Sequence, residues 1–534
     1  MNQINRKSKI SSFFELLSSH CEYIMTFALG LLMIVQRFLS GVYKPVMDDW
    51  FLYGDLYKGI SNRLANFAIP NEKFAIRPLA GVFDCFVNAP LFNHLWIVEL
   101  FLTFSLLFGS FLIIKALRRN NFASGGFFLC LVCLFPVGLE ATYWIAAATR
   151  VVYSLLFIGC ATLSLDYCYK SDKVKFLVMF AVFGMLSVCF YEPAIVVYII
   201  LTLFIVWNNY KNKKDLLPLA IMAAHIAIIG IYYILNSGSG EIESRGGFLE
   251  TDILEHTALV TDYTKNIFTD FTNSIFKNGY DKGIIIVFGG HKFIKILLIA
   301  ILSIIFGVFS AVCIKKRKVS WKILVLGIVM FFGGLSLNYI LGSDRIPLRL
   351  VFFAYLGIGI VIDELIVLLP LSFSRILCAV LLTVSAFSFT VTGIDVALTS
   401  QLINLDTKEN ITNTDKNVYV FSGQHYYDET KCVSWLDHIR GVSGNYADFT
   451  GCMRHITGAA NTNNVMPFTY GDIHKLKPFI DIEGVCNFYN IEYDRTIVPV
   501  KLVADGDNYI IKRNDDSIVG TLTKVDDVSY QFFN

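Results

Sequence analysis

The sequence predicts an all-α membrane protein that crosses the bilayer about 11 times and ends in a small α/β extracytoplasmic domain. Hydrophobic residues make up 55% of the 534 residues and charged residues only 16%, whereas soluble domains carry roughly 25% charged residues. Apolar runs of about 20 residues, the length that crosses a bilayer, recur up to residue 397. Beyond residue 398, polar turns alternate with strand-like runs such as NVYVF, RTIVPVKLV and NYIIKR.

The N-terminal segment 1–22 is basic, and we expect it to be cytoplasmic. Within it, the apolar side chains of SKISSFFELLSSH fall on roughly one helical face, which predicts an interfacial amphipathic helix. The apolar run that follows at 23–40 is longer than a typical signal-peptide core and lacks a small-residue cleavage site. We therefore interpret it as a retained first span.

The transmembrane domain is predicted to cover residues 23–397, with two large outer loops at 43–94 and 237–293. Its spans are expected near 24–42, 95–115, 122–139, 147–165, 175–191, 194–210, 216–236, 294–314, 322–341, 349–369 and 376–397.

Lysine and arginine occur in alternate loops, as the positive-inside rule requires of cytoplasmic loops. The basic set comprises Arg6/Lys7/Lys9, Lys115/Arg118/Arg119, Lys170/Lys173/Lys175, Lys211/Lys213/Lys214 and Lys315–Lys318. The opposite loops contain GLEATYW, FYEP and GSDRIPLR, which lack lysine. The N-terminus is therefore predicted to be cytoplasmic and the domain at 398–534 to lie on the outer side.

Ionisable residues gather at the predicted outer ends of the spans, where a charge is costly unless a partner or ligand uses it. The first outer loop opens with the adjacent acids Asp48 and Asp49, in KPVMDDWFLYGDL, and later carries Arg77 in IRPLAG. Further candidates at the same membrane level are Glu140, Arg150, Glu192, Asp344, Arg345 and Arg349. Distant segments thus supply both acids and arginines to one level, as an extracytoplasmic site requires.

Each candidate also has a purely structural interpretation. Asp49 precedes a segment that can open a helix, and Asp is a favoured N-cap. The arginines can pair with lipid phosphates or nearby acids, and Asp344 with Arg345 can form a local ion pair. Glu140 and Glu192 can be polar tips of hairpins.

This layout resembles the GT-C class of integral-membrane glycosyltransferases, which use a polyprenyl-phosphate sugar as donor. Within that class the chain is similar to the O-antigen glucosyltransferases of bacterial and phage serotype conversion. Those enzymes carry an acidic residue or pair after the first span and an Arg-Pro element in the first loop, here Asp48-Asp49 and Ile76–Gly81. The resemblance covers roughly residues 20–400 as a topology, and the tail has no matching motif.

The resemblance implies a multi-pass enzyme of the bacterial inner membrane that acts on the periplasmic side. It would transfer a hexose, glucose by the resemblance, from a polyprenyl phosphate to the O-antigen of lipopolysaccharide or to another lipid-linked or surface glycan. Direct displacement with inversion is expected. A carboxylate can act as general base, and a planar guanidinium suits a departing phosphate. A divalent metal between the phosphate and the acid pair is compatible with this chemistry but not required by it.

The expected roles follow from residue type. The general base is Asp49 or Asp48, with Asp49 favoured, and the other caps a helix. The donor phosphate would be bound by Arg77, Arg349, Arg150 and Arg345. Secondary site acids would be Glu140, Glu192 and Asp344. Sugar faces would stack on Trp50, Tyr143 and Trp144.

Three other functions compete with this one. A flippase for a lipid-linked sugar should show inverted repeats and mid-membrane charges, and neither is visible in the sequence. An O-antigen polymerase would use an assembled oligosaccharide donor, and an envelope scaffold would tolerate changes at Asp48 and Asp49. A nucleic-acid partner is not expected because the net charge is only +2. No P-loop or other nucleotide motif is present.

Overall fold

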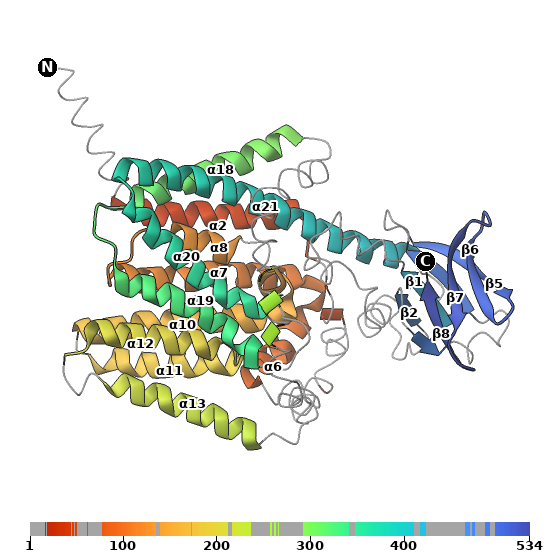
Figure 1. Cartoon of the computed structure of the whole chain (residues 1–534), viewed down its shortest axis with the longest axis horizontal. Coiled ribbons are helices and arrows are strands. Elements are labelled where there is room, and N and C mark those ends of the chain that lie inside the picture. The colour runs from red at the N-terminus through yellow and green to blue at the C-terminus, as the bar shows by residue number, and fades with distance from the viewer. Residues whose placement is uncertain are drawn as a thin grey trace.

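The computed structural model shows a bundle of helices that leads through one long helix into a β-sheet domain (Figure 1). The structure describes residues 17, 19–43, 45–46, 49–50, 61, 77–134, 139–171, 173–211, 216–235, 257–258, 261–262, 265, 292–340, 348–410, 417–422, 465–469, 473–475, 486–491 and 497–533. Most of the predicted interfacial helix lies outside these residues.

Within the described residues, the long helices are α2 (Cys21–Leu39), α7 (Leu95–Arg118), α10 (Ile145–Ser171), α11 (Val174–Phe190), α12 (Ala194–Asn209), α13 (Leu217–Leu235), α18 (Lys292–Cys313), α19 (Trp321–Ile340), α20 (Leu348–Leu365) and α21 (Leu371–Asn410). Shorter helical segments are α6 (Pro78–Phe83), η1 (Asp84–Asn88), η2 (Ala89–His94), α8 (Gly126–Cys133), α9 (Leu139–Thr142) and η6 (Ile366–Leu368).

Apolar helices of this length make the chain a multi-pass membrane protein, as predicted. In the described part of the chain, six helices have the length and composition to cross a membrane, and four shorter apolar helices accompany them. On α7 the exposed side chains Phe101, Phe104 and Phe108 form one stripe at helical spacing, while Leu102 and Leu106 beside them are buried. Such an apolar stripe suits contact with lipid, because its exposure to water would be unfavourable.

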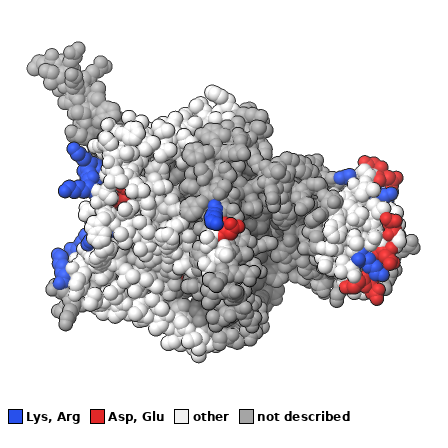
Figure 2. Space-filling view, viewed as in Figure 1, with Lys and Arg blue, Asp and Glu red and all other residues white. Residues whose placement is uncertain are grey.

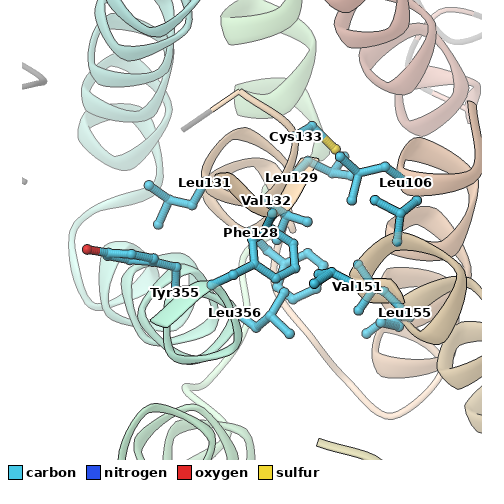
Figure 3. Packing of buried hydrophobic residues seen from close by; sticks show 14 of the residues in the cluster. Leu106, Phe128, Leu129, Leu131, Val132, Cys133, Val151, Leu155, Tyr355 and Leu356 are labelled. Carbon is cyan, nitrogen blue, oxygen red and sulfur yellow. The ribbon is translucent and has the colours of Figure 1, made fainter. Parts of the chain in front are cut away.

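The span predicted near 122–139 differs from the structure. Residues 122–134 and 139 of this run are described, and the helix within 122–134 is the eight-residue α8, every residue of which is buried. Figure 3 shows Phe128 and Leu129 of α8 packed among side chains of neighbouring helices, including Leu106 and Val151. A short apolar run cannot be told from a span by hydropathy alone, and this one is a core helix.

The two ends of the bundle differ in charge. Figure 2 shows basic side chains gathered at the end opposite the sheet domain. Buried carboxylates hold part of this charge: Asp166 accepts from Lys170 at 2.8 Å and is paired with Arg119. This polarity agrees with the loop charges, while the orientation in the membrane stays a prediction.

The segment predicted to be extracytoplasmic, from residue 398 on, begins inside a helix, because α21 continues unbroken past residue 397 to Asn410. The strands that follow are β1 (Asn417–Ser422), β2 (Val465–Thr469), β3 (Ile473–Lys475), β4 (Cys486–Ile491), β5 (Ile497–Asp505), β6 (Asn508–Arg513), β7 (Ile518–Lys524) and β8 (Ser529–Phe533). Three runs predicted as strands, in NVYVF, RTIVPVKLV and NYIIKR, are confirmed as β1, β5 and β6.

The strands form one mixed sheet in the order β2-β1-β4-β5-β6-β7-β8-β3. Strand β1 runs parallel to β2 and β4, and the other pairings are antiparallel. Phe421, Phe468 and Phe532 meet in the buried face of the sheet, with ring centroids 5.4 Å apart in each pair that includes Phe421. The sheet domain therefore has a small aromatic core of its own.

Candidate functional site

Arg77 and Glu192 form a bidentate ion pair between the first outer loop and the α11–α12 turn. The Arg77 Nε lies 2.6 Å from Glu192 Oε2, and its Nη2 lies 2.5 Å from Oε1. Arg77 is the residue before α6, whose first position is Pro78 with its preset φ. Glu192 stands between the end of α11 at Phe190 and the start of α12 at Ala194. Two residues singled out from the sequence are thus direct partners.

A second ion pair joins two more of the predicted residues. Arg349, in the first turn of α20, lies 3.0 Å from Glu140 Oε1 in α9. Its guanidinium also lies over the ring of Trp144, 5.7 Å from the centroid. The Arg349 side chain is 30% exposed, whereas that of Glu140 is only 4% exposed.

Tyr191 connects the two pairs, and the sequence did not single it out. The Arg77 guanidinium lies 4.9 Å from the centroid of its ring. Burial raises the pKa of Tyr191, and the positive charges of Arg349 and Arg77 act in the opposite direction. Both arginines therefore lie close enough to influence the same phenol. Its ring stacks on Phe353 of α20 at 6.0 Å, which joins α20 to the α11–α12 turn.

Asp49 is fully buried and serves as a cap for α10. Its Oδ1 accepts the N–H of Ala146 at 2.9 Å, and its Oδ2 accepts the Tyr43 hydroxyl at 2.5 Å and the Val46 N–H at 3.2 Å. The Tyr43 hydroxyl in turn accepts the N–H of Ile145 at 3.2 Å. The first amides of a helix have no partner within it, so the loop supplies partners for two of them. Asp49 thus acts as a helix cap, and among the described residues the helix that it caps is α10.

Tyr43 extends this network toward α2 and α7. Burial and the adjacent Asp49 carboxylate raise the pKa of Tyr43 well above its ordinary value, so the hydroxyl remains a donor. The ring of Tyr43 packs on that of Tyr143, with 5.0 Å between the centroids. The Arg37 guanidinium lies over the Tyr143 ring, 5.0 Å from its centroid. Arg37 is paired with Glu99 at 3.0 Å, and both are buried. Neither was predicted, because each lies inside an apolar run.

Arg150 is paired with Asp84 inside the bundle. The two side chains are 2.9 Å apart, and Asp84 also accepts from Asn88 at 3.2 Å. Arg150 further donates to the carbonyl of Ala146, one turn earlier in α10. Asp84 and Asn88 bound a π-helical turn, a feature that often marks functional positions. The arginine predicted to bind phosphate is here held by an acid of the first outer loop.

The aromatic residues expected to stack on sugar are all buried. Trp50 meets the edge of Phe92 at 5.8 Å, and exposed fractions are 6% for Trp50, 1% for Tyr143 and 5% for Trp144. In this structure their rings contact protein side chains. Asp48, Asp344 and Arg345 lie outside the described residues.

No group of three or more His, Cys, Asp or Glu side chains is placed to hold a metal among the described residues. Asp49, the described member of the acid pair, directs both carboxylate oxygens at N–H and O–H donors. These three donors take three of its roughly four lone-pair positions, so Asp49 as it stands here is poorly suited to bind a metal.

Comparisons with known proteins give only a distant likeness. No protein-family model matches the sequence, and no curated protein matches it. Among solved structures, ArnT from Cupriavidus metallidurans in the apo state is 13% identical, with a TM-score of 0.37 over 90% of this chain and 95% of that one. ArnT from the same organism bound to undecaprenyl phosphate is also 13% identical, with a TM-score of 0.34 over 90% of this chain and 96% of that one. Similarity at this level does not assign the chain to a family.

Proposed function

We propose that this protein is a membrane glycosyltransferase of the GT-C class that transfers a sugar from a polyprenyl-phosphate donor on the outer side of the membrane. The observation that carries the proposal is the arrangement around Tyr191: Arg77 lies over its ring, and the ring stacks on Phe353 of α20, the helix whose first turn carries Arg349. Two arginines from distant segments at one end of a membrane bundle suit a lipid-borne phosphate. The donor can enter sideways from the bilayer, so no soluble nucleotide site is needed.

In the proposed reaction an acceptor hydroxyl oxygen attacks the anomeric carbon of the donor sugar. The bond between that carbon and the phosphate oxygen breaks, and the polyprenyl phosphate leaves with the bonding electrons. A carboxylate takes the proton of the attacking hydroxyl. Arg77 and Arg349 stabilise the charge on the departing phosphate through their guanidinium N–H groups. The configuration at the anomeric carbon is inverted.

The contacts of Asp49 favour Asp48 as the general base. Three donors already point at the Asp49 carboxylate, and each of them makes it a weaker proton acceptor. In this assignment Asp49 fixes the loop against the start of α10, and the adjacent Asp48 reacts. This reverses the preference that the sequence alone suggested.

The finer identity of the reaction rests on the resemblance of the sequence. We propose glucose as the hexose, and O-antigen or another lipid-linked or surface glycan as the acceptor. The N-terminus would be cytoplasmic and the sheet domain periplasmic, in a bacterial inner membrane. The basic end of the bundle in Figure 2 supports this orientation.

Replacing either arginine tests the proposal. Arg77→Gln and Arg349→Gln should each lower sugar transfer in membranes by about 100-fold, because each removes charge stabilisation from the leaving phosphate. Arg118→Gln is the matched control, since Arg118 forms a comparable pair with Glu22 at 2.6 Å at the basic end. Full transfer activity in both test variants, with normal amounts of protein, would exclude the proposed site.

A further inference from the structure

In this structure the two arginines assigned to the donor phosphate are already occupied by carboxylates. Arg77 is paired with Glu192 and Arg349 with Glu140. The formal charges of these four groups sum to zero, so the closed arrangement has little net attraction for an anion. A phosphate and a carboxylate both match the fork of a guanidinium. A bound phosphate must therefore take the place of a carboxylate.

The two glutamates differ in how easily they can leave. The Glu192 side chain is 25% exposed, so it can turn into water when its pair opens. Glu140 is 4% exposed, and removing its partner would leave a charge in a buried place. In the Arg349–Glu140 pair, the arginine is the more exposed member, with 30% of its side chain exposed. Glu192 is therefore the carboxylate that a phosphate can displace more easily.

Backbone hydrogen bonds hold the main chain at Glu192 independently of its carboxylate. The Ile195 N–H donates to the Glu192 carbonyl at 3.0 Å, and the Ala194 N–H donates to the Tyr191 carbonyl at 3.1 Å. These bonds belong to the start of α12 and do not involve the carboxylate. Arg77 would also keep its place, because its guanidinium lies on the Tyr191 ring.

We propose that Glu192 is an internal stand-in for the donor phosphate, which it holds off Arg77 until a lipid phosphate displaces it. The inference rests on the proposed function, because it assumes that Arg77 receives the phosphate of the donor. Glu192 then sets the affinity of the site and keeps the arginine paired when no donor is bound. Glu140 remains paired with Arg349 through Nη1, and the phosphate would contact other N–H groups of that guanidinium.

Binding of undecaprenyl phosphate to the full chain in nanodiscs tests this. Glu192→Gln should bind it about tenfold more tightly, a factor that corresponds to about 1.4 kcal/mol, because the competing charge is gone. Glu140→Gln should change the affinity less. Glu22→Gln is the matched control, since Glu22 is 23% exposed and paired with Arg118 at the basic end, and its affinity should equal that of the wild type.

A second probe and a second variant keep the test decisive. Inorganic phosphate should gain affinity in Glu192→Gln by the same factor as the lipid, because the gained contact is to the phosphate itself. Should Glu192→Gln fail to fold, Glu192→Asp shortens the bidentate contact and should give a smaller gain. Unchanged or weaker binding of undecaprenyl phosphate by a folded variant overturns the proposal, as does a gain confined to the lipid.

An assay of sugar transfer distinguishes failure of this inference from failure of the proposed function. If the wild type transfers sugar and Glu192→Gln gains no affinity, the transferase stands and the stand-in role is wrong. If the folded wild type neither binds undecaprenyl phosphate nor transfers sugar, both are wrong.

Discussion

At the scale of single residues, the end of the bundle that carries the candidate site is organised by pairs of opposite charges and by hydrogen bonds to buried carboxylates. Asp49 shows how one side chain can fix a loop to a helix that begins almost a hundred residues later. Its bond to Ala146 spans 97 positions in the chain. A carboxylate that accepts several donors in a buried place contributes to stability as long as each donor remains.

Tyr43→Phe tests this arrangement. The change removes the hydroxyl that donates to Asp49 and accepts from Ile145. We expect the free energy of unfolding to fall by about 1.5–3 kcal/mol, the range for a hydrogen bond to a charged group. Thermal unfolding of the purified protein in detergent would show this as a lower Tm.

Tyr153→Phe is the control for that measurement. Tyr153 is half-buried against Phe83 and Phe190, and its hydroxyl makes no hydrogen bond to the described residues. Its loss should leave Tm nearly unchanged. Equal Tm values for the two variants would show that Asp49 does not depend on Tyr43.

The sequence could indicate which residues belong to the site but not which partners they have. Acids and arginines at the ends of apolar runs stand out because charge is costly there. The partner of Arg77 lies 115 positions away and that of Arg349 lies 209 positions away. Such pairings depend on how the helices pack. Arg37 and Glu99 escaped notice because nothing in an apolar run distinguishes a buried ion pair from a tolerated surface charge.

At the scale of elements, apolar length predicted the helices and close packing decides how they fit. The length of the apolar runs predicted the long helices correctly but predicted a span where α8 lies, because hydropathy shows only that a segment avoids water. The span predicted at 376–397 lies within α21, which continues to Asn410, because a helix can extend from lipid into water without a break. Between helices, glycine sets the closest approach: a Cβ on Gly159 of α10 would lie 2.5 Å from the Gly109 carbonyl oxygen of α7.

Gly159→Ala should therefore separate α7 and α10. Alanine gains up to about 1 kcal/mol in helix propensity, but a backbone clash cannot be relieved by a side-chain rotation and costs about 1–3 kcal/mol. A lower Tm is expected. Gly230→Ala on α13 is the control, because a Cβ there meets nothing within 4 Å, and its Tm should stay the same or rise. A Tm for Gly159→Ala at or above that of the wild type would contradict the close packing.

At the scale of the whole molecule, basic side chains gather at the end of the bundle opposite the sheet domain (Figure 2), and the paired charges of the candidate site join other helix ends, so that the molecule has one polar axis. The loop charges predicted this axis, and the helix ends agree with it. The site lies toward the end from which α21 leads to the sheet domain (Figure 1). What the sheet domain recognises had no signal in the sequence, because its strands carry a core pattern and no motif of known chemistry.

The central claim is tested most directly by sugar transfer from an undecaprenyl-phosphate hexose to a lipid-linked glycan, with purified full chain in liposomes. The account predicts transfer by the wild type and a loss of about 100-fold or more in Asp48→Asn with unchanged Tm. Asp49→Asn should lower Tm along with activity, because it removes the cap of α10. A folded wild type that transfers no sugar, or an Asp48→Asn variant as active as the wild type, would contradict the account.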